Sequence, residues 1–254
     1  MRTSRASRIA CVAAVCSAVG VAAEARAADD ASGGPGAAES RAPRGPRTGF
    51  QTGVRVGYTY GLGVVYHGLN LSDASSGALP VLVDAGWRVL PELYLGVYGQ
   101  YAPVFLKTYA LTCQSGWSCT AQDYRFGVQG DYHFLPQRPF DPYVGLGAGY
   151  EILHSSFDGS TVVPQGATYV RATLVEDFTD RGWEFASLTA GFDWRFSETF
   201  GVGPFLLGTV GEYNTQSGAI TIRSGTQQQP EPVQPIQMAA HALVFVGVRG
   251  TFNL

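Results

Sequence analysis

The stretch that decides the fold is Asp123–Phe134, with the sequence DYRFGVQGDYHF. Even-numbered positions carry apolar side chains or glycine, and odd-numbered positions carry polar side chains or glycine. Successive side chains of a β-strand point to opposite faces, so strict alternation is the pattern of a strand with one apolar and one polar face. We therefore predict a strand over this segment.

The same alternation recurs before and after this segment and predicts eight strands in all. The other seven are Phe50–Tyr60, Val81–Leu90, Leu93–Tyr101, Tyr143–Ile152, Trp183–Phe196, Phe200–Val210 and Ala240–Leu254. The strand Phe200–Val210 is the least regular, because Phe205-Leu206-Leu207 interrupts the alternation and Pro204 has no N–H to donate to a ladder. Strand-like segments at Tyr169–Val175 and Ile220–Arg223 are expected to extend hairpins above the bilayer, and a ten-stranded count is the alternative.

The connections between these strands alternate in length. Three are short and four are long: Leu90–Glu92, Leu135–Asp141 and Ser197–Thr199 against Gly61–Pro80, Ala102–Gln122, Leu153–Gly182 and Glu212–Ala239. Short periplasmic turns opposite long extracellular loops are typical of antiparallel barrels in the bacterial outer membrane. The expected fold class is all-β, an eight-stranded antiparallel transmembrane barrel of up-and-down topology.

A soluble barrel also alternates, but it turns its apolar face inward. Here the polar face mixes charged residues with glycine, as at Gly53, Arg55 and Gly57, which suits a lumen just wide enough for side chains. The apolar face is rich in aromatic residues near strand ends, where the interfacial girdles of membrane barrels lie. The membrane barrel is the better interpretation.

The N-terminus predicts export. Arg2, Arg5 and Arg8 precede a short apolar run, and Ala25-Arg26-Ala27 resembles a cleavage site, so residues 1–27 are predicted to be a cleaved signal peptide. An uncut membrane anchor is the alternative. Residues 28–48 are predicted to be a disordered periplasmic linker, because they are rich in Gly, Pro and Ala and lack apolar periodicity. Residues 49–254 are the predicted barrel.

Charge excludes one class of partner. Removing residues 1–27 takes away four arginines and one glutamate, which leaves a formal charge of −6 on the mature chain. A nucleic-acid partner would need a basic face, so none is expected.

The polar faces supply a predicted set of charged residues in the lumen. Its members are Arg55, Asp84, Arg88, Glu92, Asp123, Arg125, Asp131, Glu151, Asp193, Arg195 and Arg249. Residues of both signs can pair across so narrow a barrel and form a plug that braces it. A selective narrow pore is the alternative. The plug is preferred.

Catalytic and metal-binding residues are not expected. Cys113 and Cys119 are the only cysteines after residue 27, and in an oxidising compartment they are predicted to form a disulfide in an extracellular loop. A metal site would need more ligands than this loop offers, and no cofactor is expected. His154, Ser155 and His241 are the residues to weigh for catalysis, and a loop or interface position is preferred for both histidines.

The last predicted strand ends with Gly250, Phe252 and Leu254. This ending looks like the C-terminal signal by which the barrel-assembly machinery recognises outer-membrane proteins. In that signal the aromatic residue is the last one. Over residues 49–254 the chain resembles the small outer-membrane barrels of the OmpA, OmpX and OmpW type, without a periplasmic domain. The resemblance implies a monomer in the outer membrane of a Gram-negative bacterium, surrounded by lipid and lipopolysaccharide. The expected role is non-enzymatic, structural or surface-binding through the loops. A narrow porin-like channel and, more distantly, a lipid A-modifying enzyme are the alternatives.

Overall fold

A computed structural model describes residues 48–66, 69–108, 113–165, 168–224, 227–232 and 239–254. The chain divides into Met1–Ser40, which lies outside the described residues, and Arg41–Leu254, which contains all the described structure. The predicted signal peptide and all but the last residue of the predicted linker therefore lie outside the described part. Within the described ranges, no helix is long and apolar enough to cross a membrane.

Eight long strands and four short elements make up the described structure. The long strands are β1 (Gly49–Tyr66), β4 (Val81–Leu90), β5 (Leu93–Leu106), β6 (Ser118–His133), β7 (Phe140–Gln165), β8 (Thr168–Arg195), β9 (Phe200–Ser224) and β11 (Ala239–Asn253). The short elements are β2 (Leu69–Asn70), α1 (Leu71–Ala74), β3 (Ser75–Ala78) and β10 (Gln227–Pro232).

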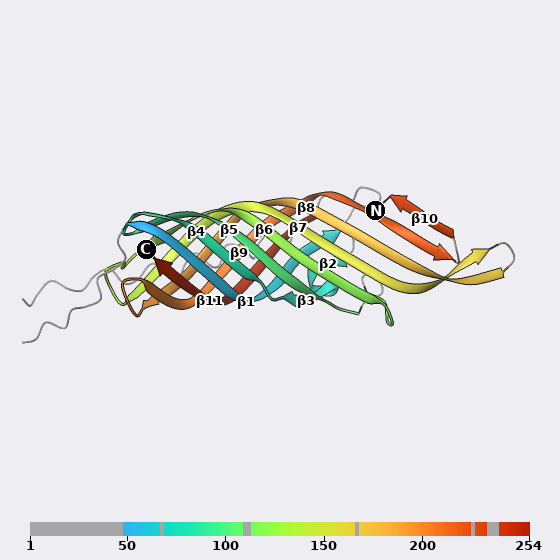
Figure 1. Ribbon diagram of the computed structural model, residues 1–254, viewed down its shortest axis with the longest axis horizontal. Coiled ribbons are helices and arrows are strands. Elements are labelled where there is room, and N and C mark those ends of the chain that lie inside the picture. The colour runs from blue at the N-terminus through green and yellow to red at the C-terminus, as the bar shows by residue number, and fades with distance from the viewer. Residues whose placement is uncertain (1–47, 67–68, 109–112, 166–167, 225–226, 233–238) are drawn as a thin grey trace, which may run out of the picture. The chain divides into compact units, whose positions relative to one another are not determined.

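The eight long strands close into an antiparallel barrel (Figure 1). Each strand pairs with the next long strand in the sequence, from β1–β4 through to β9–β11. The ring closes where β11 pairs with β1, from Gln51 opposite Asn253 to Gly63 opposite His241. A closed ring leaves no free strand edge at the level of the membrane, which is the condition for a sheet to span a bilayer. The predicted fold is confirmed, with eight strands in the ring.

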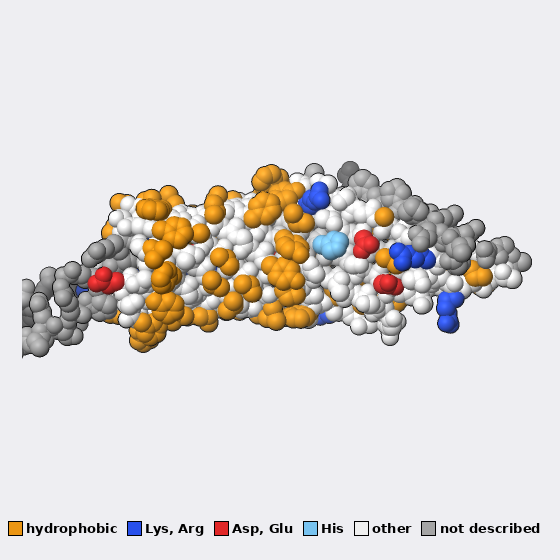
Figure 2. All heavy atoms as spheres, viewed as in Figure 1, with side chains coloured by type: hydrophobic (Ala, Val, Ile, Leu, Met, Phe, Trp, Pro, Cys, Tyr) orange, Lys and Arg blue, Asp and Glu red, His pale blue; other side chains and the backbone are white. Residues whose placement is uncertain are grey.

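The outer face of the barrel is apolar and carries two aromatic belts (Figure 2). One belt lies near the short turns and includes Trp87, Phe134 and Trp194, whereas the other includes Tyr60, Tyr101, Tyr124 and Trp183, and all seven side chains are exposed. Ten residue steps along β6 separate Tyr124 from Phe134. At ~3.3 Å per residue and a tilt of about 40°, the belts lie roughly 25 Å apart along the axis, the height of an apolar membrane band.

Most described residues of the long connections continue the strands, as predicted for Tyr169–Val175 and Ile220–Arg223 and over a longer stretch than the sequence indicated. β7 and β8 pair as far as Gln165 opposite Thr168, and β8 and β9 as far as Thr173 opposite Arg223. Figure 1 shows this extension of β7, β8 and β9 at the end opposite the short turns. Beyond the belts the outer face meets water and needs no apolar residues, so the hydrophobic alternation fades although backbone pairing persists.

Pro204 has the local effect that the sequence predicted, while β9 runs through it. Pairing between β8 and β9 passes from Gly191 opposite Phe205 to Trp194 opposite Val202, so the ladder is interrupted next to Pro204. On its other side Pro204 stays opposite Val248 of β11. The interruption on one side agrees with the absence of an N–H on proline.

Candidate functional site

The lumen holds ten of the eleven charged residues that the sequence predicted. Their side chains are almost inaccessible, with at most 6% of each residue exposed: Arg55, Asp84, Arg88, Asp123, Arg125, Asp131, Glu151, Asp193, Arg195 and Arg249. Glu92 is the exception and a correction, because it lies half-buried in the turn between β4 and β5. The alternation of β4 ends at this turn, so it no longer determines where the Glu92 side chain points.

The central group of the plug consists of two arginines and two aspartates from four strands. Arg55 lies 3.4 Å from Asp131 and 3.9 Å from Asp84, and Arg249 lies 2.9 Å and 3.9 Å from the same carboxylates. All four residues have at most 1% of their surface exposed. Removing one partner from a buried pair costs about 3–5 kcal/mol, because the other charge stays buried and unpaired.

A second group lies toward the short turns. Arg88 donates to Gln51 Oε1 at 3.0 and 2.8 Å and to the carbonyl of Pro91. His133 and Arg195 both bind Asp141 Oδ2, at 2.8 and 2.7 Å. Gln51, His133 and Asp141 were not predicted to be members of the plug. Gln51 and His133 do lie on the polar faces of their predicted strands, whereas Asp141 was assigned to a turn.

A third group, which we call the floor group, lies toward the long hairpins and consists of Asp123, Arg125, Glu151, Glu184, Tyr213 and His241. Arg125 binds Asp123 at 2.9 Å, Glu151 at 3.2 Å and Glu184 at 3.7 Å. Glu151 also accepts a hydrogen bond from the Tyr213 hydroxyl and lies 3.0 Å from His241 Nε2. His241 is therefore a lumen residue, which corrects the loop or interface position preferred from the sequence.

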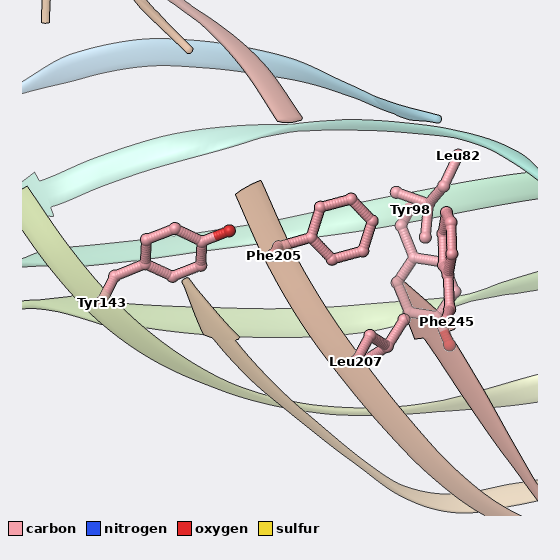
Figure 3. Packing of buried hydrophobic residues seen from close by; sticks show 6 residues of the cluster. All are labelled: Leu82, Tyr98, Tyr143, Phe205, Leu207 and Phe245. Carbon is pink, nitrogen blue, oxygen red and sulfur yellow. The ribbon is translucent and has the colours of Figure 1, made fainter. Parts of the chain in front are cut away.

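An apolar layer inside the barrel completes the plug (Figure 3). It contains Leu82, Tyr98, Tyr143, Phe205, Leu207 and Phe245. The rings of Phe205 and Phe245 meet edge to face at 4.7 Å, and the Arg249 guanidinium lies 4.7 Å from the centre of the Tyr143 ring. These six residues were not predicted to point into the lumen, because apolar side chains of the strands were expected to face lipid.

The plug leaves little free space. Among the described residues, the cavity between Arg55, Leu82, Gln129 and Leu207 has a volume of about 10 Å³. A cavity needs ~10–15 Å³ to hold one water molecule, so this space holds no continuous column of water. Ion pairs and hydrogen bonds of this kind can brace the barrel from within.

A larger chamber lies on the far side of the floor group, toward the long hairpins. Its volume is about 390 Å³, within the ~300–1,000 Å³ range of small-molecule sites. Its walls are mostly apolar, and α1 and β3 contribute to them: Leu69, Leu71, Ala74, Ala78, Ala102, Val104, Leu106, Ala121, Leu153, Phe157, Phe178 and Leu243. Asp123, Arg125, Glu151 and Asp180 also line it.

Asp180 lies beyond the aromatic belt, three residues from Trp183 on β8. It is 8% exposed and accepts a 2.8 Å hydrogen bond from Gln216. Burial raises the pKa of the Asp180 carboxyl from 3.8 to about 6, and the bond from Gln216 opposes that rise. No sequence pattern pointed to this residue, because it falls in a segment without clear alternation.

The remaining predicted residues are distributed as follows. Cys113, which lies between β5 and β6, forms the predicted disulfide with Cys119 at the start of β6. Gly250, Phe252 and Leu254 lie at the end of the chain, with Phe252 and Leu254 exposed on the outside, and their role in assembly stays a prediction.

His154 is exposed and Ser155 is buried on the opposite face of β7, so the two do not form a catalytic pair. No metal-binding group of three or more residues occurs within the described ranges.

Closed pairing, an apolar outer face with two aromatic belts and a charged lumen define the chain as a small transmembrane β-barrel protein. No protein-family model matches the chain, and no curated protein matches its sequence. Solved structures similar to it include small outer-membrane barrels, and the outer membrane protease OmpT from Escherichia coli is also among them, 6% identical with a TM-score of 0.31. Neisserial surface protein A is 13% identical over 79% of this chain and 95% of its own, with a TM-score of 0.41. OprG from Pseudomonas aeruginosa is 10% identical over 82% and 99%, with a TM-score of 0.41. A major outer membrane protein from Thermus thermophilus is 12% identical over 80% and 99%, with a TM-score of 0.45.

Proposed function

We propose that the protein is a non-enzymatic, non-conducting barrel of the outer membrane of a Gram-negative bacterium, which presents its long hairpins outside the cell for binding. The observation that carries this proposal is the division of the barrel into a filled middle and an elaborated end. The ion pairs and the apolar layer fill the lumen between the belts. The extension of β7, β8 and β9 continues well past the second belt.

The orientation follows from the short turns and long hairpins. Short turns face the periplasm in outer-membrane barrels, and longer connections face the outside. Lipid and lipopolysaccharide would then surround the outer face, and the barrel-assembly machinery would read the C-terminal strand. A closed eight-stranded barrel needs no second copy to complete its sheet, in keeping with a monomer.

The channel alternative has less support, because two arginines and two aspartates with at most 1% exposure occupy the centre of the lumen. For the lipid A-modifying alternative, the two residues weighed as a pair, His154 and Ser155, point to opposite faces of β7. The binding role at the hairpin end remains the function that the geometry supports best.

Labelling of single-cysteine variants on intact cells tests the proposal. Tyr169, at the tip of the β7–β8 hairpin, is 77% exposed, and Ser197 lies exposed in the short turn between β8 and β9. A membrane-impermeant maleimide should label Tyr169→Cys on intact cells. It should label Ser197→Cys only after the outer membrane is permeabilised. The reverse pattern, or equal labelling of both variants, would overturn the proposed display of the hairpins.

A further inference from the structure

The chamber contains buried oxygen atoms without hydrogen-bond partners. Thr59 Oγ1, Asp123 Oδ1 and Gln216 Oε1 all belong to residues that line it, and each atom is buried and unpartnered. Thr59 and Asp123 are each 6% exposed. Buried polar atoms normally have a partner, so these three oxygens mark places on the chamber wall where a ligand can form hydrogen bonds.

The orientation of Gln216 shows what kind of group is missing. Its Nε2 donates to Asp180 at 2.8 Å, which fixes the amide with Oε1 as the atom left over. An amide oxygen and a carboxylate oxygen can only accept hydrogen bonds, and a hydroxyl can accept as well. A ligand that donates N–H or O–H groups would therefore satisfy the oxygens of Asp123 and Gln216.

The charged residues that line the chamber indicate that the donor is a cation. Three carboxylates and one arginine line it, and that arginine also binds Glu184 outside the lining. The central group of the plug is different, because its two arginines match its two aspartates. Asp180 accepts its hydrogen bond from the neutral Gln216. The excess of carboxylates would attract a cation and repel an anion.

The walls determine the rest of the ligand. Leucine, alanine, valine and phenylalanine side chains surround the space above the carboxylates. A small hydrated cation would leave these walls without contact, whereas an apolar body would bury its surface against them.

We infer that the chamber is a binding site for an apolar molecule bearing one ammonium group, with the ammonium between Asp123, Asp180 and Gln216 and the apolar body against the walls. A primary ammonium carries three N–H donors, and the unpartnered oxygens of Asp123 and Gln216 and the carboxylate of Asp180 can accept from it. This inference goes beyond the display of the hairpins and does not depend on it.

Calorimetric titration of the full chain in zwitterionic lipid nanodiscs tests the site, with empty nanodiscs subtracted for partitioning. The probe is 1-naphthylmethylammonium, compared with the alcohol and the carboxylate of the same ring system and with methylammonium. We expect saturable 1:1 binding of the probe at least about tenfold tighter than that of the alcohol, and no binding of the carboxylate or of methylammonium. Equal affinity for probe and alcohol, or no saturable binding, would overturn the inference.

Matched variants locate the site. Asp180→Asn removes a carboxylate from the chamber wall and should weaken probe binding about tenfold. Asp177→Asn makes the same change three residues away on β8, where the side chain is exposed outside the barrel, and should leave the affinity unchanged. Ala102→Phe should fill the chamber and abolish binding of both probe and alcohol, because Ala102 is buried in its wall. Each variant is first shown to fold by its altered gel mobility before boiling. Equal effects of Asp177→Asn and Asp180→Asn, or full binding by Ala102→Phe, would contradict the assigned place.

Discussion

Val128 and Gln129 are neighbours on β6 that meet two different environments. Val128 is 60% exposed on the lipid face between the belts, whereas the Gln129 side chain accepts a 3.1 Å hydrogen bond from Arg55 in the lumen. At the residue scale, the environment on each side of the wall decides what a substitution costs.

Val128→Arg should destabilise the barrel by about 2–4 kcal/mol, because it places a charge near the middle of the bilayer. The control is Val162→Arg, since Val162 is 61% exposed on the extension of β7 beyond the belt and should lose less than about 0.5 kcal/mol. Reversible urea unfolding in lipid vesicles measures both. Equal costs would contradict the assignment of the lipid face.

Arg125→Met should cost about 3–5 kcal/mol, because it leaves Asp123, Glu151 and Glu184 buried around an uncharged side chain. Arg171→Met provides the comparison, because Arg171 is exposed on β8 and its loss should change the free energy of unfolding by at most about 0.5 kcal/mol. Reversible urea unfolding in lipid vesicles measures the free energy of unfolding of both variants. A stable Arg125→Met variant would mean that the floor group does not depend on its arginine.

Asp180 should make stability depend on pH. Its pKa is raised in the folded chain, from 3.8 to about 6, so the folded state holds the proton more tightly than the unfolded state. The protonated Asp180 carboxyl contributes up to about 3 kcal/mol to the free energy of unfolding. This contribution is fully present below pH 3.8 and is lost as the pH rises through about 6.

Comparison of the wild type with Asp180→Asn isolates this effect. Asp123, Arg125, Glu151 and Tyr213 face the same chamber from other strands and are present in both proteins, so their effect on stability is common to both. As the pH rises from about 3.5 to about 7.5, the variant should become more stable relative to the wild type. This range spans the pKa of the Asp180 carboxyl in the unfolded chain, 3.8, and in the folded chain, about 6. A constant difference between the two proteins across this range would show that Asp180 keeps its ordinary pKa.

At the scale of elements, the extension of β7 and β8 is separable from the barrel. Asp158 lies opposite Val175, so the residues between them form the outer part of one hairpin. Replacing residues 159–174 by Asn-Gly should join the strands through a tight turn that suits two antiparallel neighbours. The shortened protein should still run at a different apparent size before and after boiling. Loss of this heat-modifiable migration would mean that the extension is needed for the barrel to form.

The strands between the belts could be predicted from sequence, because the two environments impose strict alternation there. Phe126 and Val128 face outward and Arg125 faces inward as expected. The outer parts of β7 and β8 were predicted only in part, at Tyr169–Val175, since water lies outside the wall at that level and apolar alternation fades. Phe205 and Leu207 were misleading for another reason: both point into the lumen, where polar residues were expected.

At the scale of the whole molecule, the plug and the chamber depend on residues distant in sequence. Arg125 binds residues of β7 and β8, and the His241 that contacts Glu151 is 90 positions away. Alternation predicts that such side chains point inward, but the stagger of the strands decides which of them meet. The identity of the lumen residues was therefore accessible from sequence, whereas their pairing and the chamber above them were not.

Closure of the lumen is the claim on which the functional proposal depends, and conductance in a planar bilayer tests it most directly. The wild-type protein should show no steady conductance, because Arg55, Arg249 and the apolar layer occupy the space that ions would need. Arg55→Ala should open volume and leave carboxylates in excess, so any current it gains should favour cations. A large, stable conductance in the wild type would contradict the plug and make the protein a channel.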